Sequence, residues 1–202
     1  MQKPDSVNLI TEQLEESIAA HQALLQSGET IKLLSLWGIR CAEALEKGGT
    51  IFFAGNGGSF ADAQHMAAEL TGKMGRMRRS LSGLALGANN SSLSAIGNDF
   101  GFELAFAREL EGLHKPHSVV IAFSTSGDSK NLVELAKQAK DLEIPMLCLT
   151  GAKKGQIAEY CEILQVPSTR TERIQEIQTL LGHTLCLVIE EEMGLSNEPY
   201  NS

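Results

Sequence analysis

The sequence has no apolar run that approaches the roughly 20 residues needed to cross a bilayer. Its N-terminal stretch is polar and amphipathic, which is not the pattern of a signal peptide. It also has no long basic block, and with a net charge of −8 a broad nucleic-acid-binding face is not expected. These absences predict a cytoplasmic globular protein that binds neither membranes nor nucleic acid.

Paired cysteine motifs are missing as well. The chain has four scattered cysteines and no C-x-x-C spacing, at Cys41, Cys148, Cys161 and Cys186. A disulfide framework or a zinc ribbon would need closer or paired spacing. We expect buried free thiols of a reducing compartment.

Two common nucleotide-binding loops are absent too. The glycine turn at 55–58 is followed by Ser59 and Phe60, whereas a G-x-G-x-x-G loop would need a third glycine at Phe60. The Lys-Ser/Thr pair of a P-loop is also missing. Nothing in this turn therefore supports dinucleotide binding or nucleotide hydrolysis.

What is present is a strand, a glycine turn and a helix over residues 48–73. Residues 50–54 are a short apolar run suited to a buried strand, and Ser59 is a suitable helix cap. Asp62 is expected in the first helical turn, where it would favour the helix dipole. A glycine turn that leads into a helix N-terminus is an anion site. His65 and Glu69 are four residues apart and so neighbour each other on this helix, although such a pair alone is more often a solvated ion pair.

Strands and helices alternate along the rest of the chain, which predicts a mostly parallel sheet with helices on both faces. Strands are expected at 50–54, 83–86, 118–123, 145–150 and 162–166. Helices are expected at 100–113, 131–142, 155–160 and 171–193, with a short helix near 89–95, a turn at 97–99 and a surface loop at 73–79. Two further helices, 5–27 and 29–47, precede the first strand and have no obvious place in the sheet. We expect residues 1–48 to form a helical arm that packs on another subunit, and residues 49–202 to form one α/β unit.

A second loop of interest, Ser124-Thr125-Ser126-Gly127-Asp128-Ser129, lies between a predicted buried strand and a helix. Its hydroxyls and free N–H groups suit a phosphate, although a Ser-rich helix cap would read the same way. Two such loops at the carboxyl edge of one parallel sheet favour the binding interpretation, because open α/β sheets bind ligands there.

The final helix supplies the third group of polar residues. Gln175 and His183 are eight residues apart and can share one broad face of this helix. On its own, a histidine among the leucines and Cys186 of that helix would more often be a packed core residue.

In combination, the motifs GNGGSFADAQHMAAELTGK, AIGNDFGFE, FSTSGDSKN, LTG and RIQEIQTLLGH resemble the phosphoheptose isomerases of the sugar-isomerase (SIS) fold. The resemblance spans about residues 8–193, with the motifs in order. It implies a three-layer α/β/α, flavodoxin-like SIS domain, a homotetramer, and active sites near subunit interfaces. The chain departs from the family where it lacks prolines after Gly72 and where Glu172 replaces a common Asp.

The resemblance also implies a set of site residues. Zinc would be held by the residues at the family's ligand positions, His65, Glu69, Gln175 and His183. The sugar phosphate would be held at Asn56, Gly57, Gly58, Asn98, Asp99, Ser124, Thr125, Ser126 and Ser129. We place Ser59, Glu69 and Gln175 at the substrate as well.

The chemistry agrees with this assignment. Aldose–ketose isomerisation moves a proton between C1 and C2 through an enediol, and it needs a base, a second proton carrier and a group that polarises the oxygens. Glu69 is the expected base at C2, and His183 is its expected partner at C1. A carboxylate cannot easily be a tight metal ligand and a free base together, so Glu69 would leave the metal during turnover. Glu176 is the alternative base.

The sequence therefore predicts a zinc-dependent isomerase that converts D-sedoheptulose 7-phosphate to D-glycero-D-manno-heptose 7-phosphate. The product would enter heptose biosynthesis for lipopolysaccharide core, capsule or another glycoconjugate. One alternative is a non-catalytic SIS protein that binds a replication initiator, but such relatives lack the glutamate and the C-terminal histidine. The other is an isomerase of a different sugar phosphate.

Overall fold

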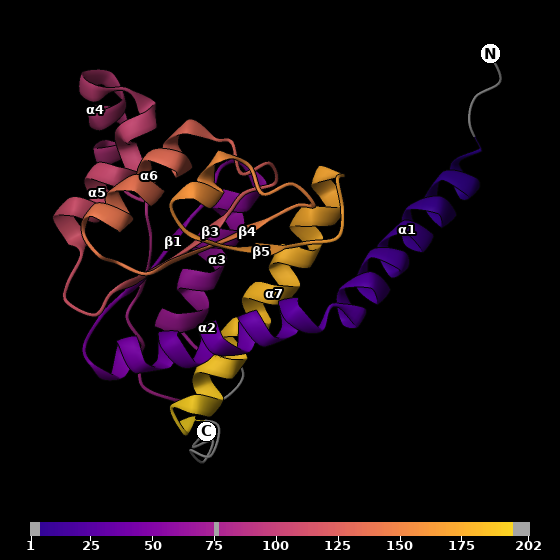
Figure 1. The fold of residues 1–202 in the computed structure, drawn as a ribbon, viewed down its shortest axis with the longest axis horizontal. Helices are drawn as coiled ribbons and strands as arrows, with labels where there is room; N and C mark the ends of the chain where they lie inside the picture. Colours follow the sequence, from indigo (N-terminus) through magenta and orange to yellow (C-terminus); the bar gives the residue numbers. More distant parts are fainter. Residues whose placement is uncertain (1–4, 75–76, 196–202) are drawn as a thin grey trace.

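The computed structural model describes residues 5–74 and 77–195. Five parallel strands form one sheet in the order β2-β1-β3-β4-β5 (Figure 1). Their bounds are Ile51–Ala54 (β1), Gly83–Ala85 (β2), Val119–Phe123 (β3), Met146–Thr150 (β4) and Glu162–Gln165 (β5). This is the flavodoxin-like order, so the predicted fold class is confirmed.

Helices cover both faces of the sheet, as the alternating sequence predicted (Figure 1). The α-helices are Ser6–Gln26 (α1), Gly28–Glu46 (α2), Gly58–Thr71 (α3), Asn90–Phe100 (α4), Ala105–Leu113 (α5), Lys130–Asp141 (α6) and Thr171–Glu192 (α7). Two short 3₁₀ helices, Phe102–Leu104 (η1) and Gln156–Glu159 (η2), complete the described elements.

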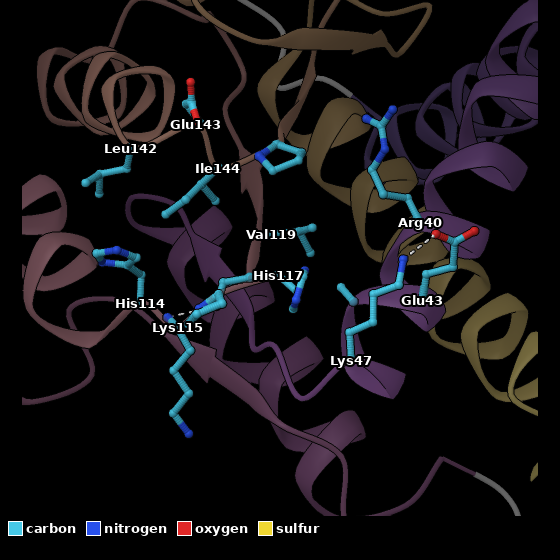
Figure 2. A pocket seen from close by; sticks show the side chains of 14 residues that line it. Arg40, Glu43, Lys47, His114, Lys115, His117, Val119, Leu142, Glu143 and Ile144 are labelled. Atoms are coloured by element: carbon cyan, nitrogen blue, oxygen red, sulfur yellow. Dashed lines mark hydrogen bonds and ion pairs between the residues drawn. The ribbon is translucent and has the colours of Figure 1, made fainter.

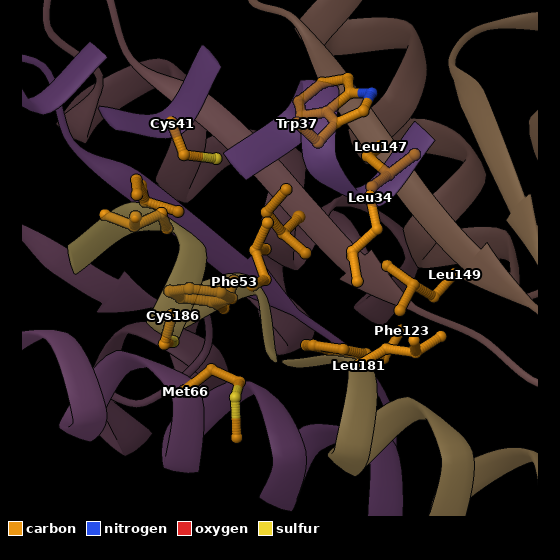
Figure 3. Packing of buried hydrophobic residues seen from close by; sticks show 14 of the residues in the cluster. Leu34, Trp37, Cys41, Phe53, Met66, Phe123, Leu147, Leu149, Leu181 and Cys186 are labelled. Atoms are coloured by element: carbon orange, nitrogen blue, oxygen red, sulfur yellow. The ribbon is translucent and has the colours of Figure 1, made fainter. Parts of the chain in front are cut away.

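The strands divide their side chains between two hydrophobic cores, because successive residues of a strand point to opposite faces. Ile51 and Phe53 belong to the core beneath α2, α3 and α7, whereas Phe52 and Ala54 belong to the core beneath α5 and α6. Figure 3 shows the first of these cores, where Trp37 and Met66 pack with strand residues and with residues of α7. Both faces of the sheet are thus buried, as expected of a parallel sheet.

The two N-terminal helices differ in their relation to the sheet. Trp37 of α2 is 1% exposed, and its indole N–H donates to Glu162 on the edge strand β5 at 3.1 Å. α2 is therefore part of the packed domain. α1 extends away from the body of the molecule and buries only Ala20 and Leu24 (Figure 1). Contact of this arm with another subunit stays a prediction.

The structure corrects three local predictions. α3 begins at Gly58 with Gly57 as its cap, so Ser59 lies inside the helix and does not cap it. Gly57 has a φ of +56°, a conformation that favours glycine. The predicted turn at 97–99 is the last turn of α4. The predicted helix 100–113 is interrupted at Gly101, whose φ of +95° ends α4 before η1 and α5 begin.

The prediction that residues 73–79 are a surface loop is wrong in one respect, the exposure of Arg78. Gly75 and Arg76 lie outside the described residues, but the side chain of Arg78 is only 1% exposed and pairs with Glu190 of α7. A run of basic residues gave no sign that one of them is buried, because its partner is more than 100 positions away in the sequence.

Within residues 5–74 and 77–195, no helix combines the length and the apolar character that a membrane span requires. The four cysteines are free, as predicted. Burial raises the pKa of the Cys161 and Cys186 thiols to about 12. Such thiols are almost entirely protonated at neutral pH and are therefore unreactive.

Candidate active site

The two predicted anion loops lie side by side at the carboxyl edge of the sheet. β1 and β3 are hydrogen-bonded neighbours, and the chain order reverses between them. Ligands of open α/β sheets bind at this kind of switch point. The side-chain amides of Asn56 and Asn131 exchange two hydrogen bonds, of 2.9 and 2.8 Å, and so tie the turn after β1 to the start of α6.

The hydroxyls of the second loop have separate roles. Ser124 is 4% exposed, and its hydroxyl accepts a hydrogen bond from the Gly127 backbone N–H at 3.0 Å. Ser126 likewise accepts from the Asp128 N–H at 3.1 Å. Ser129 is the residue before α6, and its hydroxyl makes no capping bond. Ser124 and Ser126 therefore shape the loop, while Ser129 offers a hydroxyl to a ligand.

A small cavity of about 200 Å³ opens beside this loop. Its wall is rich in hydroxyls and includes one cation and the first residues of α7; the lining residues are Thr125, Ser126, Ala152, Lys153, Ser168, Thr169, Thr171 and Ile174. Hydroxyls beside a helix N-terminus suit a phosphoryl or sugar oxygen. Lys153, Ser168 and Thr169 were not among the predicted site residues.

α3 and α7 bring three polar side chains together. His65 Nε2 lies 3.0 Å from Glu69 Oε1, and His183 Nε2 lies 3.9 Å from the same oxygen. The two Nε2 atoms are 3.4 Å apart, with the rings nearly perpendicular. Tetrahedral zinc with bonds of about 2.0–2.1 Å separates its nitrogen ligands by about 3.3–3.4 Å. Two imidazoles and a carboxylate, all within 4.8 Å, thus fit the predicted metal.

The close approach of α3 and α7 explains how residues more than 100 positions apart meet. A Cβ on Gly182 would lie 2.6 Å from the sulfur of buried Met66, so the absence of a side chain there brings the helices together. Thr179 donates a 2.6 Å hydrogen bond to Asp62. Asp62 therefore joins α3 to α7. The prediction that it lies in the first turn of α3 is wrong.

Gln175 and Glu176 point in different directions from the first part of α7. The Gln175 amide packs against Gly58, since a Cβ on Gly58 would lie 2.6 Å from its nitrogen. Glu176 instead bonds to Ser17 of α1 and to Arg173. Within this chain, Gln175 faces the glycine turn and Glu176 faces the arm, which favours Glu69 over Glu176 as the base.

Gln178 is a positioning residue that the sequence did not single out. It is fully buried, and its amide N–H₂ donates to the carbonyls of Leu149 (2.7 Å) and Ser124 (3.2 Å) at the ends of two strands. Its oxygen accepts a long hydrogen bond of 3.5 Å from Ser59. The only sequence signal was a polar residue on the apolar face of a helix.

Within the described residues, no contact joins Asn98 or Asp99 to the cluster of His65, Glu69 and His183. They lie on α4, which has no buried residue, and they are exposed and hydrogen-bonded to each other at 2.7 Å. Their predicted contact with substrate stays a prediction.

Residues 12–151 match the SIS domain family. Phosphoheptose isomerase 1 of Campylobacter jejuni is 45% identical over 187 residues, 92% of this chain and 98% of its own. The solved phosphoheptose isomerase of Francisella tularensis has a TM-score of 0.86 at 30% identity, with 93% of this chain and 99% of that one covered. That of Neisseria gonorrhoeae, named GmhA, has a TM-score of 0.79 at 37% identity, with 93% and 100% covered. The chain belongs to the phosphoheptose isomerases of the SIS-domain family.

The protein also has a cavity of about 450 Å³ at the opposite, amino edge of its sheet (Figure 2). Cations line it, but Lys47 pairs with Glu43 and Arg40 pairs with Glu162. In Figure 2 the Lys115 side chain points away from the labelled groups on α2. Among the described residues, the group with metal-ligand geometry is His65, Glu69 and His183, so the candidate active site is the α3–α7 cluster with its adjoining loops.

Proposed function

We propose that the protein isomerises D-sedoheptulose 7-phosphate to D-glycero-D-manno-heptose 7-phosphate. The observation that carries this is the cluster of the Glu69 carboxylate with two imidazoles, beside two phosphate-type loops at the switch point of the sheet. The names of the relatives agree with it. The product would serve heptose biosynthesis for lipopolysaccharide, capsule or another glycoconjugate.

Two side chains carry the proton transfers in this proposal. Glu69 exchanges the proton at C2 of the sugar, and His183 exchanges the proton at C1 or its oxygen. The Glu69 side chain is 19% exposed and that of His183 is 30% exposed, so both are accessible from solvent but partly shielded. This partial burial strengthens their interactions with charge that develops on the enediolate.

The bound group in this proposal is zinc, with His65, Glu69, Gln175 and His183 as its ligands. Zinc supplies Lewis-acid polarisation of the sugar oxygens. The donor set fits that chemistry, because imidazole nitrogens and a carboxylate oxygen are ordinary zinc ligands. Gln175 would add an amide oxygen from the same helix as His183.

The glycine turn and the serine loop would hold the phosphate. Backbone N–H groups at the start of α3 and the Ser129 hydroxyl, which makes no capping bond, lie at the same edge of the sheet. Asn56, Gly57, Gly58 and Ser59 would act from the first loop, and Ser124, Thr125, Ser126 and Ser129 from the second. Asn98 and Asp99 would complete the site from α4.

We further propose a cytoplasmic homotetramer. Free thiols support a reducing compartment. The apolar face of α1 supports the oligomer, since Val7, Ile10 and Leu14 are each at least 60% exposed. Such a stripe on a projecting helix is normally covered by another chain.

The test is the reaction itself, run in deuterated water. Wild-type protein with sedoheptulose 7-phosphate should yield an aldoheptose phosphate with deuterium at C2. Glu69→Gln should lose roughly 10²–10⁴-fold in kcat and in exchange, the usual worth of a positioned acid–base group. The amide is nearly isosteric, so folding and KM should be preserved.

Glu176→Gln is the matched control, because it makes the same change on the face of α7 that contacts α1. It should retain exchange. If Glu69→Gln exchanges as fast as wild type, Glu69 is not the base. If wild type leaves sedoheptulose 7-phosphate unchanged, the substrate is a different sugar phosphate or the protein is a non-catalytic SIS relative.

A further inference from the structure

The Arg78 side chain bonds to both helices of the site. The side chain is 1% exposed, and its guanidinium pairs through Nε with Glu190 of α7. Nη2 donates to the backbone carbonyl of Glu69 at 2.6 Å. Nη1 donates to the carbonyls of Leu70 (3.0 Å), Gly72 (3.3 Å) and Arg79 (3.0 Å). One planar group therefore contacts α3, the following loop and α7.

The contacts to α3 satisfy a specific need of that helix. The last carbonyls of a helix have no partner within it, and a cation there is also favoured by the helix dipole. α3 has no basic residue in its own last turn. Arg78 supplies that charge from beyond the helix end, and one of the carbonyls that it holds belongs to Glu69 itself.

The contact to α7 is equally specific. Glu190 is 5% exposed and lies seven residues after His183, two helical turns along the same face. Cys186 lies between them and is fully buried. Burial raises the pKa of this thiol most; Glu69 and Glu190 raise it further, and Arg78 lowers it.

α3 and α7 run in the same direction, so that residues later in α3 meet residues later in α7. Asp62 meets Thr179, His65 meets His183, and Met66 meets Gly182. Beyond the end of α3, the Arg78–Glu190 pair adds a further contact to α7. The three side chains of the site thus lie between an Asp62–Thr179 contact on one side and the Arg78–Glu190 contact on the other.

We propose that Arg78 is a positioning residue for the isomerase reaction, which holds the end of α3 against α7 and so fixes Glu69 relative to His183. This inference rests on the proposed roles of those two residues. Lysine cannot replace it, because one ammonium cannot span the carbonyls of α3 and the carboxylate of Glu190 as a planar fork does. Glu190 anchors the guanidinium from the other helix.

Arg78→Lys tests this, with Arg79→Lys as the matched control. Arg79 is the next residue, is exposed, and undergoes the same chemical change. Arg78→Lys should lower kcat roughly 10–100-fold and weaken Zn²⁺ binding by a similar factor, the usual effect of disturbing groups that orient metal ligands. KM should stay within about twofold, since the phosphate loops adjoin the opposite end of α3. Zn²⁺ affinity is measured on metal-stripped protein by competition with a chromophoric chelator, well below the melting temperature.

A merely structural role would lower the melting temperature and leave kcat and Zn²⁺ affinity of the folded protein unchanged. If Arg78→Lys matches Arg79→Lys in both quantities, the proposal is overturned. If Arg78→Lys does not fold, the near-isosteric Glu190→Gln decides: reduced kcat with unchanged KM supports the proposal, and wild-type kcat overturns it. Wild type and His65→Ala are titrated alongside. A wild type that does not bind Zn²⁺ overturns the proposed metal site, and the positioning role is then judged on kcat alone.

Discussion

At the scale of single residues, identical side chains in one loop have different tasks. Ser124 and Ser129 belong to the same hydroxyl-rich stretch, and the sequence treats them alike. In the structure, Ser124 is buried and bonds its own loop, whereas the Ser129 hydroxyl has no capping bond. Ser124 therefore has a role in the fold in addition to any contact with substrate, whereas no such role is seen for the Ser129 hydroxyl.

Ser129→Ala should therefore raise KM about tenfold or more and leave kcat and the melting temperature nearly unchanged. A hydrogen bond to a charged group is worth about 1.5–3 kcal/mol, and a phosphate contact acts equally in the ground and transition states. Ser124→Ala should raise KM too, but with a lower melting temperature, since it leaves the Gly127 N–H without its partner. Steady-state kinetics and thermal unfolding of both variants separate the two roles. An unchanged KM for Ser129→Ala would remove this hydroxyl from the phosphate site.

Sequence reasoning was also uneven at this scale. The His65–Glu69 pair follows from helical spacing alone, and the structure places the two side chains 3.0 Å apart. Asp62 was expected to interact with the dipole of its own helix, but it accepts a hydrogen bond from Thr179 of α7. Gln178 and Arg78 were missed because their partners lie on other elements, and no local pattern encodes a contact across the molecule.

At the scale of elements, the site depends on how closely α3 and α7 approach. Gly182 sits where the helices touch, and Met66 fills the space opposite. α1 is attached to the first turns of α7 by polar groups, including the pairs of Arg170 with Glu16 and of Glu176 with Ser17. α7 thus contacts both α3, at the site, and α1, at its own first turns.

Gly182→Ala should separate the helices and lower both stability and activity. The added Cβ would lie 2.6 Å from the Met66 sulfur in a closed core, and overpacking of this kind costs about 1–3 kcal/mol. Thermal unfolding and kcat are the measurements. Gly112→Ala on α5 is the matched control, because a Cβ there meets nothing within 4 Å. It should be neutral or stabilising, since alanine favours a helix over glycine by roughly 0.5–1 kcal/mol. Equal melting temperatures for the two variants would show that the helices are not held at this contact.

At the scale of the whole molecule, the sheet gathers the loops and α1 leaves an apolar face uncovered. The strand order places the ends of β1 and β3 next to each other, so that residues 75 positions apart, Asn56 and Asn131, come into contact. The exposed stripe of α1 has no cover within the described part of the chain. In the proposed tetramer, a second copy of the chain covers this stripe.

Light scattering should accordingly give four times the 21.8 kDa mass of the chain. Leu14→Asp should shift the protein to a smaller species, because Leu14 is 60% exposed on the apolar face and a carboxylate there would be buried on assembly. Asn8→Asp adds the same charge to an exposed position on the polar face of α1 and should leave the mass unchanged. A monomeric wild type at micromolar concentration would contradict the role assigned to the arm.

The sequence by itself determined the class of fold, the elements and most of the candidate residues. Apolar runs separated by glycine turns specify buried parallel strands, and the motifs around His65, Ser124 and His183 identify the chemistry, because both signals are local. The tertiary structure alone decided that α2 belongs to the domain, that α4 extends through 97–99, and that Arg78 is buried. It also decided which hydroxyls are free and which carboxylate faces the two imidazoles. These outcomes depend on packing between segments far apart in the chain, where burial and distance set the chemistry of a side chain and neighbouring residues do not reveal it.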